Sequence, residues 1–223
     1  MKKKNIFSRY LSYRRNFGTI EPVSRVFGLE RGVAIDRYYI EKFLLKNQSL
    51  IRGTVLEVGD SRYTRKFGGK KVEKSFVLNK NEGKSNVDFI ADLETGSGMP
   101  CDLADCFIMT QTLLCTFDVN AAAKNALGAL KSGGVILVTV PGITQISRFD
   151  YVRWGQYWSF TDLSLRKIFE RHVPSENIIV ETYGNVKIAD AFLWGLALHE
   201  IQEKDLDYVD PDYQLVITGV IKK

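Results

Sequence analysis

The stretch that most constrains the fold runs from Gly53 to Asp60 and reads Gly-Thr-Val-Leu-Glu-Val-Gly-Asp. Thr54 to Val58 are apolar except for Glu57, which is the pattern of a short buried strand. In an open α/β sheet, ligands bind outside the carboxyl ends of the strands, where a glycine lets the backbone turn sharply and approach the ligand. The stretch therefore predicts either a ligand-binding strand end or an ordinary glycine turn, and the rest of the chain has to decide between them.

Composition sets broad limits on the protein. The chain has 223 residues, of which 45% are hydrophobic and 26% charged, as in one α/β domain with a small appendage. The formal net charge is +5, and six basic residues lie within the first fifteen positions, so the body is close to neutral. This balance gives no basis for a general nucleic-acid-binding surface.

The cysteines and histidines argue against a metal site. Cys101, Cys106 and Cys115 have neither zinc-finger spacing nor an even count, which fits a reducing compartment. The only two histidines, His172 and His199, are far apart in sequence. No stretch approaches the roughly 20 apolar residues of a membrane span. We therefore predict a cytoplasmic protein without a metal.

The N-terminus differs from the rest of the chain. We predict a basic, partly helical extension over residues 1–34 and one domain over residues 35–223. A rough helical stripe within the extension is formed by Ile6, Phe7, Tyr10, Leu11, Arg14 and Phe17. This stripe either docks on the core or is disordered, or else makes weak peripheral contact with an acidic membrane or a partner.

The remaining sequence alternates strand and helix patterns, which predicts a doubly wound sheet. Asp36 is a candidate N-cap for the first helix, and the turn at 131–134 should separate a helix from the central strand. The predicted strands are 54–58, 72–78, 87–90, 103–110, 135–140, 177–183 and 213–221. The predicted helices are 36–44, 119–130, 161–171 and 186–202, with a short polar helix or turn at 61–69.

From Ile35 to the end, the sequence resembles the class I S-adenosylmethionine-dependent methyltransferases. Four stretches match the motifs of that family in order: Val55–Asp60, Ile90–Leu93, Phe107–Leu113 and Leu130–Gly142. The resemblance implies a Rossmann-like seven-stranded α/β sheet that is mostly parallel, with an antiparallel last strand and helices on both faces. It also implies S-adenosyl-L-methionine as cofactor.

Three further stretches resemble a narrower bacterial branch of that family. They are Ile35–Glu41, Arg153–Thr161 and Tyr208–Tyr213. Members of the branch occur with, or fused to, glycosyltransferases of surface-polysaccharide assembly. By association only, this implies a sugar or glycan acceptor and a glycosyltransferase partner.

The sequence departs from the family pattern at two places. Asp60-Ser61 follows Gly59, where a second glycine is usual two positions on. The second strand ends in Asn79 instead of an acid that grips the ribose, and Glu82 follows three residues later. Either Glu82 reaches back or cofactor affinity is reduced, because an amide makes weaker hydrogen bonds than a carboxylate.

The resemblance assigns roles to residues at the strand ends. Glu57 and Gly59 would face the methionine part of the cofactor, and Asn79 the ribose. Gln111 would lie near the amino-acid part or the methyl group. The other implied cofactor-binding residues are Asp60 and Ser61 beside Gly59, Asp92 and Leu93 at the adenine, and Tyr38 or Arg37 closing over from the first helix. For Tyr38, core packing is the equal alternative.

The acceptor is expected beneath the segment 149–160, which follows the fifth strand. It holds six aromatic residues with charged and amide side chains between them. Aromatic faces suit the C–H faces of a sugar ring, and polar side chains suit its hydroxyls; the alternative is a hydrophobic lid. The candidate substrate-binding residues are Arg153, Trp154, Tyr157 and Trp158.

A hydroxyl acceptor needs a general base to remove its proton, usually a histidine or a carboxylate. Position favours Asp150 as the catalytic residue, with Asp118 as a second candidate. His172 follows a predicted helix and is more typical of a helix C-terminal cap.

These residues predict an O-methyltransferase that acts on a sugar or glycan hydroxyl in surface-polysaccharide biosynthesis. Two alternatives remain: a non-catalytic methyltransferase-like module that docks to a glycan-assembly enzyme, and a methyltransferase for a non-sugar small molecule. A dinucleotide-dependent oxidoreductase fits poorly because no Gly-x-Gly-x-x-Gly follows Val58.

Overall fold

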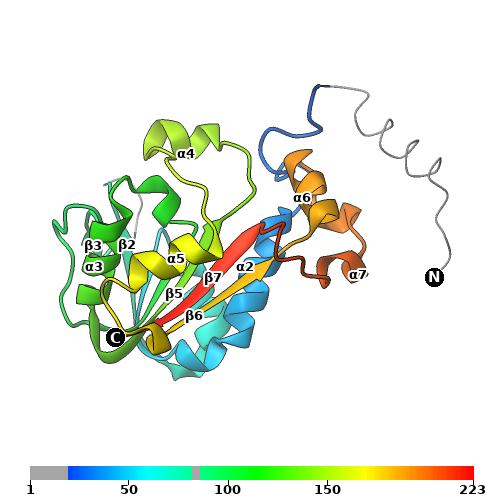
Figure 1. The fold of residues 1–223 in the computed structure, drawn as a ribbon. Coiled ribbons are helices and arrows are strands. Elements are labelled where there is room, and N and C mark those ends of the chain that lie inside the picture. Colours follow the sequence, from blue (N-terminus) through cyan, green and yellow to red (C-terminus); the bar gives the residue numbers. More distant parts are fainter. Residues whose placement is uncertain (1–19, 82–85) are drawn as a thin grey trace.

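The protein folds around one mixed sheet. The computed structural model describes residues 20–81 and 86–223. Seven strands lie in the order β3-β2-β1-β4-β5-β7-β6, and they are parallel except that β7 runs antiparallel to both of its neighbours (Figure 1). This is the predicted Rossmann-like α/β sheet, mostly parallel with an antiparallel last strand.

The elements follow the predicted order along the chain. The strands are β1 (Gly53–Val58), β2 (Val72–Asn79), β3 (Phe89–Ile90), β4 (Ala104–Thr110), β5 (Leu130–Pro141), β6 (Ile178–Tyr183) and β7 (Val216–Lys222). The helices are α2 (Ile35–Lys46), α3 (Val119–Ala129), α4 (Arg148–Arg153), α5 (Asp162–Phe169), α6 (Val186–Leu193) and α7 (Glu203–Leu206). Between β1 and β2 the chain makes only a π-helical turn (Thr64–Gly68) and a 3-10 turn (Gly69–Lys71), as its polar sequence predicts.

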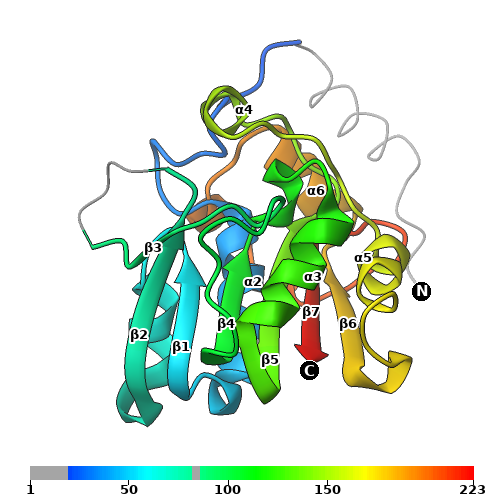
Figure 2. The same ribbon diagram turned by 90° about the vertical axis from the view of Figure 1, so that its left-hand side faces the viewer.

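Helices cover both faces of the sheet, and each face has its own apolar core (Figure 2). On one face α3 and α5 pack over a cluster that includes Phe107 and Phe169, both fully buried. On the other face α2 and α6 pack over a cluster that includes Tyr39 and Phe43. Because the central strands are buried on both sides, they need the nearly continuous apolar sequence seen in β4 and β5. These two cores fix the strand ends that form the upper edge of the sheet in Figure 2.

Helices α4 and α7 were not predicted, and two other elements differ most in extent from the prediction. The helix expected over 186–202 ends at Leu193, because the chain turns at Gly195 with a left-handed φ of +74°. The Trp194 carbonyl there accepts hydrogen bonds from the N–H groups of Val23 and Ser24. The turn expected at 131–134 is instead part of β5, which begins at Leu130 and pairs with β4 through a register shift.

The expected capping role of Asp36 is wrong. Helix α2 begins one residue earlier, so Ala34 occupies the N-cap position and no side chain caps this end. Asp36 therefore lies inside the first turn of the helix.

The predicted N-terminal stripe lies in residues 1–19, outside the described residues. Residues 20–33 form bends and turns without a helix. The Arg31 guanidinium ties this segment to the body through the Gly195 carbonyl (2.9 Å) and the Glu200 carboxylate (2.6 Å). The division at residues 34 and 35 remains a prediction.

Asn185 supports the first turn of α6 and the loop that follows α7. Its Oδ1 accepts the N–H groups of Lys187 and Ile188 (3.1 Å each), and its Nδ2 donates to the carbonyls of Asp205 and Tyr208 (2.8 Å each). Because the residue is buried, Asn185→Ala should lower the free energy of unfolding by about 2–4 kcal/mol, from loss of the cap and of two buried bonds. Urea unfolding should show a lower midpoint at unchanged slope.

Thr161→Ala provides the matched control. Thr161 caps α5 through the Ser164 N–H at an exposed position. Its loss should cost about 1 kcal/mol. Equal losses for the two variants would show that the additional bonds of Asn185 contribute nothing.

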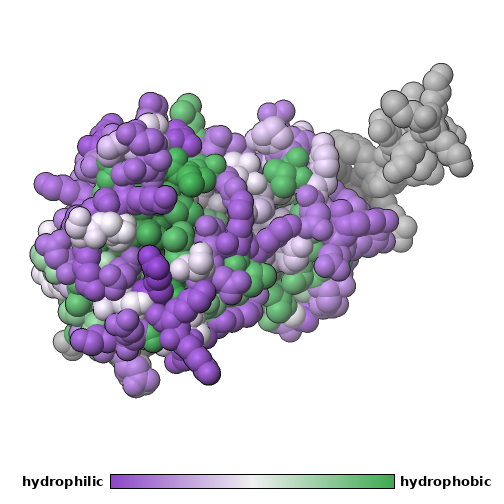
Figure 3. Space-filling model, turned by 90° about the horizontal axis from the view of Figure 1, so that it is seen from below, coloured by the Kyte–Doolittle hydropathy of each residue, from purple (hydrophilic) through white to green (hydrophobic). Residues whose placement is uncertain are grey.

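The face drawn in Figure 3 is mostly hydrophilic, with hydrophobic residues gathered in smaller patches between the charged ones. This is the usual result when sheet and helices turn their apolar sides inward. Within residues 20–81 and 86–223, no helix has the length and apolar character needed to cross a bilayer.

Candidate cofactor-binding site

A cavity of about 300 Å³ lies at the carboxyl edge of the parallel strands. Its walls come from the ends of β1, β2 and β4, from the turn after β3, and from α2 and α4. Helix α4 arches above this edge (Figure 2). Seven of the nine residues predicted to bind the cofactor line this cavity: Glu57, Gly59, Asp60, Asn79, Asp92, Leu93 and Gln111.

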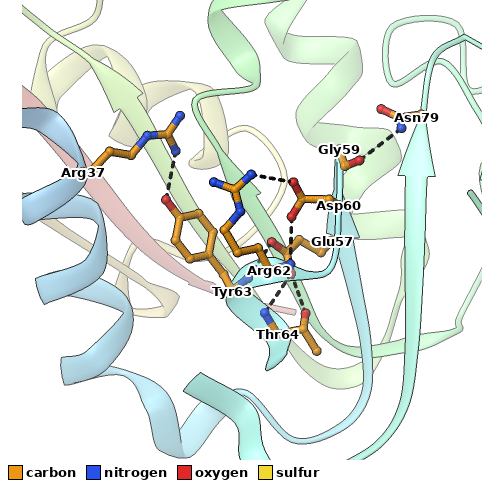
Figure 4. Close-up of polar contacts among 8 residues, drawn as sticks. All are labelled: Arg37, Glu57, Gly59, Asp60, Arg62, Tyr63, Thr64 and Asn79. Atoms are coloured by element: carbon orange, nitrogen blue, oxygen red, sulfur yellow. Dashed lines mark hydrogen bonds and ion pairs between the residues drawn. The ribbon is translucent and has the colours of Figure 1, made fainter. Parts of the chain in front are cut away.

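Glu57 holds the loop that forms the floor of the cavity (Figure 4). Its carboxylate is 2% exposed and accepts the N–H groups of Tyr63 (3.1 Å) and Thr64 (2.8 Å), as well as the Thr64 hydroxyl (2.7 Å). Burial raises the pKa of Glu57, and these hydrogen bonds partly oppose the rise. Both oxygens are engaged within the protein, so the residue shapes the cavity by anchoring the loop.

Gly59 turns the chain away from β1 at the cavity. Its φ of +92° is in the left-handed region, and no atom lies within 4 Å of the place where a Cβ would stand. Its carbonyl accepts a hydrogen bond from Asn79 Nδ2 (3.2 Å), which joins the ends of β1 and β2 (Figure 4). The open space beside Gly59 suits close approach of a ligand to the backbone.

Asp60, the acid of the first motif, bonds to Arg62 in its own loop. Asp60 accepts the Arg62 N–H (2.8 Å) and pairs with the Arg62 guanidinium (3.2 Å). Both side chains are largely exposed. Ser61 does not line the cavity; its carbonyl accepts the Arg65 N–H in the next turn (3.0 Å).

Asp92 faces the cavity from the turn after β3. Its Oδ1 accepts the Glu94 N–H (2.8 Å), and its Oδ2 pairs with Lys80 Nζ (3.1 Å). Desolvation acts to raise the pKa of Asp92, but the bonds from Glu94 and Lys80 outweigh it and the net shift is downward. Asp92 therefore presents an ionised carboxylate to the cavity at neutral pH. Glu82, the other acid considered for this region, lies outside the described residues.

Gln111 holds a strained position at the exit of β4. Its φ of +49° is unusual for a residue with a side chain. Its N–H donates to the carbonyl of the buried Thr139 (2.8 Å), which fixes this conformation. Strain of this kind clusters at binding and catalytic sites, and here it places Gln111 between this cavity and a second one.

Of the two candidates on the first helix, Arg37 reaches the cavity and Tyr38 does not. Arg37 lines the cavity and donates to the Tyr63 hydroxyl (2.9 Å). Tyr38 points elsewhere, and its hydroxyl donates to Asp207 (3.1 Å). Successive helix residues point in directions about 100° apart, so only one of the two can face the site.

The segment after β5 supplies two residues to the cavity, Asp150 and Trp154. The Ser147 side chain caps α4, and Phe149 packs edge-on against Trp154 with ring centroids 5.9 Å apart. The Arg153 guanidinium lies 3.5 Å from the centroid of the Phe149 ring and does not line the cavity.

Tyr157 and Trp158, expected at the substrate, form a separate aromatic cluster with Phe117. Ring centroids lie 5.5 Å apart for Phe117–Tyr157 and 6.1 Å apart for Phe117–Trp158. The Trp158 indole donates to the carbonyls of Thr116 and Phe117. Neither residue lines this cavity or the second one described below, and both side chains remain partly exposed.

The other acid–base candidates are engaged outside the cavity. Asp118 caps α3 by accepting the Ala121 N–H (2.9 Å), and His172 Nε2 lies 3.1 Å from Asn120 Oδ1. Cys115 lines the cavity, but burial raises its pKa to about 12, so the thiol stays protonated. In the part of the chain that the structure describes, no cluster of three or more His, Cys, Asp or Glu side chains could hold a metal ion.

Sequence reasoning missed several lining residues. Arg62 and Tyr63 come from the turn after Gly59, and Thr112 and Cys115 from the loop after Gln111. No sequence signal marks them individually, although each follows a strand end that the motifs identify. Their place in the cavity depends on how the loops turn back.

Comparison with solved structures identifies the fold. No family model and no curated protein matches the sequence. A methyltransferase from Archaeoglobus fulgidus described as SAM-dependent has a TM-score of 0.51 at 13% identity, covering 96% of this chain and 99% of that one. The N-methyltransferase NodS from Bradyrhizobium japonicum, in complex with S-adenosyl-L-homocysteine, has a TM-score of 0.52 at 13% identity, covering 96% and 97%.

A third similar structure is described as a [4+2]-cyclase, SpnF, with a TM-score of 0.53 at 18% identity, covering 94% of this chain and 91% of that one. At these identities the likeness defines the fold alone. The chain has the Rossmann-like fold of class I S-adenosylmethionine-dependent methyltransferases.

Proposed function

We propose that this protein is an S-adenosylmethionine-dependent methyltransferase that O-methylates a sugar or glycan hydroxyl. The observation that carries the proposal is the cavity at the carboxyl ends of the parallel strands, which is lined by residues from three of the four family-like stretches together with Asn79. Residues that lie up to 54 positions apart, from Glu57 to Gln111, line one space. The parallel sheet itself brings these strand ends to one edge, and the open backbone at Gly59 and the ionised Asp92 make the space between them suitable for a ligand.

The residues present fit the cofactor. The open backbone at Gly59 leaves room for the methionine part, and Asn79 and the ionised Asp92 offer hydrogen-bond partners for ribose and adenine. Arg37 and Arg62 offer cations for the cofactor carboxylate. Asn79 replaces the usual acid, so its bonds to hydroxyls are weaker than charge-assisted ones.

The bound cofactor would supply a methyl group already activated on a sulfonium. The chain then has to align the acceptor and exclude water. Helix α4 supports this role because it closes the upper side of the cavity with Asp150 and Trp154. The interleaved aromatic and polar side chains of this segment support a sugar as acceptor, and the resemblance to glycosyltransferase-associated proteins supports a place in polysaccharide assembly and a glycosyltransferase partner.

The non-catalytic module remains the second candidate, because this fold does not imply methyl transfer: a similar structure is described as a cyclase. The altered first motif favours it, because Ser61 stands where a second glycine is usual and the neighbouring Asp60 is paired to Arg62. Transfer of a labelled methyl group from S-adenosylmethionine to lipid-linked glycan extracts, compared with small metabolites, separates the candidates. A protein that binds the cofactor and labels only non-sugar metabolites would contradict the glycan acceptor.

Asp92→Ala should weaken binding of S-adenosylhomocysteine by at least tenfold in calorimetric titration. A hydrogen bond to a charged group contributes about 1.5–3 kcal/mol, and 1.4 kcal/mol corresponds to about tenfold in affinity. Lys80 can yield to the ligand because its pair with Asp92 is half-exposed and such pairs contribute about 0–1 kcal/mol.

Asp212→Ala serves as the control, because Asp212 is exposed and lies outside the cavity. Its affinity should equal that of the wild type. An unchanged affinity for Asp92→Ala would show that the adenine lies elsewhere.

A further inference from the structure

A second cavity of about 480 Å³ adjoins the first. It lies between the segment 25–29, the start of α2, helix α4 and the ends of β5 and β7. The two cavities share three lining residues, Arg37, Gln111 and Asp150, so they meet at the exit of β4. A molecule in the second cavity would face one in the first across these side chains.

Asp36 lines only the second cavity, and one oxygen of its carboxylate has no hydrogen-bond partner in the protein. Its Oδ1 is buried and has no hydrogen-bond partner. Among the described residues, the Arg31 Nε is the only other buried side-chain atom in this condition. A buried carboxylate oxygen without a partner is costly, so its retention in the wall of a cavity points to a partner that arrives with a ligand.

The surroundings of Asp36 favour the protonated form of its carboxyl group. Burial raises the pKa of Asp36, and the neighbouring Arg37 only partly opposes the rise. Arg37 itself is held by the Tyr63 hydroxyl. The remaining charged groups that line the cavity are Arg25 from the N-terminal segment and Arg148 and Asp150 from α4.

We propose that the second cavity holds the hydroxyl-bearing acceptor and that Asp36 is the general base that takes its proton. This inference rests on the proposed function. As the bond from the acceptor oxygen to the methyl carbon forms, the proton passes to Asp36, the methyl–sulfur bond breaks, and its electron pair stays on sulfur. Asp36 then releases the proton to solvent.

A base at this place fits a hydroxyl acceptor. A hydroxyl has to lose its proton during methyl transfer, whereas a carboxylate is already nucleophilic. Aromatic and aliphatic side chains from Phe27, Leu29 and Phe149 line the same cavity and offer apolar surface for the body of the acceptor. Asp150, the base expected from sequence, lines both cavities at their junction, where it can orient the acceptor.

The test compares the wild type with Asp36→Asn, Asp150→Asn and Asp118→Asn, the last as a control that caps α3 outside both cavities. Calorimetry measures S-adenosylhomocysteine affinity. Tritiated methyl transfer is followed to p-nitrophenyl hexosides and to lipid-linked glycan extract. A ¹³C NMR titration of the labelled aspartate carboxyls, with the Asp36 signal assigned by its absence in Asp36→Asn, follows ionisation directly.

Asp36→Asn should lose at least about 100-fold in methyl transfer, within the usual contribution of a general base, while its S-adenosylhomocysteine affinity stays within about twofold. Asp118→Asn should match the wild type in both. The Asp36 signal should titrate above the range of an exposed aspartate with S-adenosylhomocysteine bound.

Transfer by Asp36→Asn within about threefold of the wild type would overturn the inference, as would a loss confined to Asp150→Asn. An equal loss of S-adenosylhomocysteine affinity in Asp36→Asn would overturn it too. If neither the hexosides nor the extract are labelled, the NMR titration decides. A pKa of Asp36 within the range of an exposed aspartate overturns the inference, and a pKa above that range supports it. Absence of S-adenosylhomocysteine binding by the wild type would instead remove the proposed function itself.

Discussion

Glu57→Ala is expected to lower the free energy of unfolding by about 3–5 kcal/mol, because it strands two buried N–H donors that each cost about 1–3 kcal/mol. The donors are the N–H groups of Tyr63 and Thr64, and the Thr64 hydroxyl loses its acceptor as well. The protein shields these donors from solvent, since Glu57 and Thr64 are each 2% exposed. Urea unfolding at neutral pH measures the loss.

The same variant should lose S-adenosylhomocysteine binding by at least about 100-fold, as the loop from Gly59 to Thr64 leaves its place. Glu57→Gln is the matched control. Its amide oxygen keeps an acceptor for Thr64 or Tyr63, so both losses should be intermediate. A fully stable Glu57→Ala with weakened binding would show that the carboxylate contacts the ligand and does not anchor the loop.

Gly59→Ala is expected to reduce S-adenosylhomocysteine affinity by roughly 10–100-fold, since forcing a side chain into such a backbone conformation costs about 1–3 kcal/mol. At φ +92° the added Cβ meets no atom of the protein, so the penalty comes from the backbone. Relief requires the peptide to rotate, which moves the carbonyl that Asn79 holds (3.2 Å). Calorimetry on the folded variant measures the change.

Gly69→Ala is the control that separates the effect of backbone strain on stability from the effect on ligand affinity. Gly69 has a φ of +56°, and an added Cβ there would also meet no atom within 4 Å, but the residue lies outside the cavity. Both variants should lose similar stability, and only Gly59→Ala should lose affinity. Equal affinities for the two variants would contradict the placement of Gly59 beside the ligand.

The fold could be predicted largely because its strands are buried on both faces. Burial on two sides forces the continuous apolar runs of β4 and β5, which are unmistakable in sequence. The end of α6 could not be predicted, because it depends on the contact of Trp194 with the segment around Val23, far away in sequence. The apolar pattern continues past Leu193, so a prediction from periodicity alone makes this helix too long.

The cofactor cavity could be predicted because parallel strands bring their carboxyl ends to one edge. Gly59, Asn79, Asp92 and Gln111 meet there for that reason. Side-chain direction was harder to predict. A start of α2 one residue earlier than expected removes the capping role of Asp36.

The segment after β5 shows the same limit. Of its four predicted substrate residues, Trp154 faces a cavity, whereas Arg153 stacks on Phe149. Tyr157 and Trp158 follow Gly155, which has a left-handed φ, and they pack against Phe117 instead. Composition predicts an aromatic lid here, but only the backbone path decides which rings reach the site.

Calorimetric titration of the wild-type protein with S-adenosylmethionine and S-adenosylhomocysteine tests the central claim most directly. The convergence of Gly59, Asn79 and Asp92 on one cavity predicts saturable binding of both ligands with one site per chain. Competition between the two ligands should be complete, because they would share the cavity. Absence of heat and of any thermal stabilisation at millimolar ligand would contradict the claim.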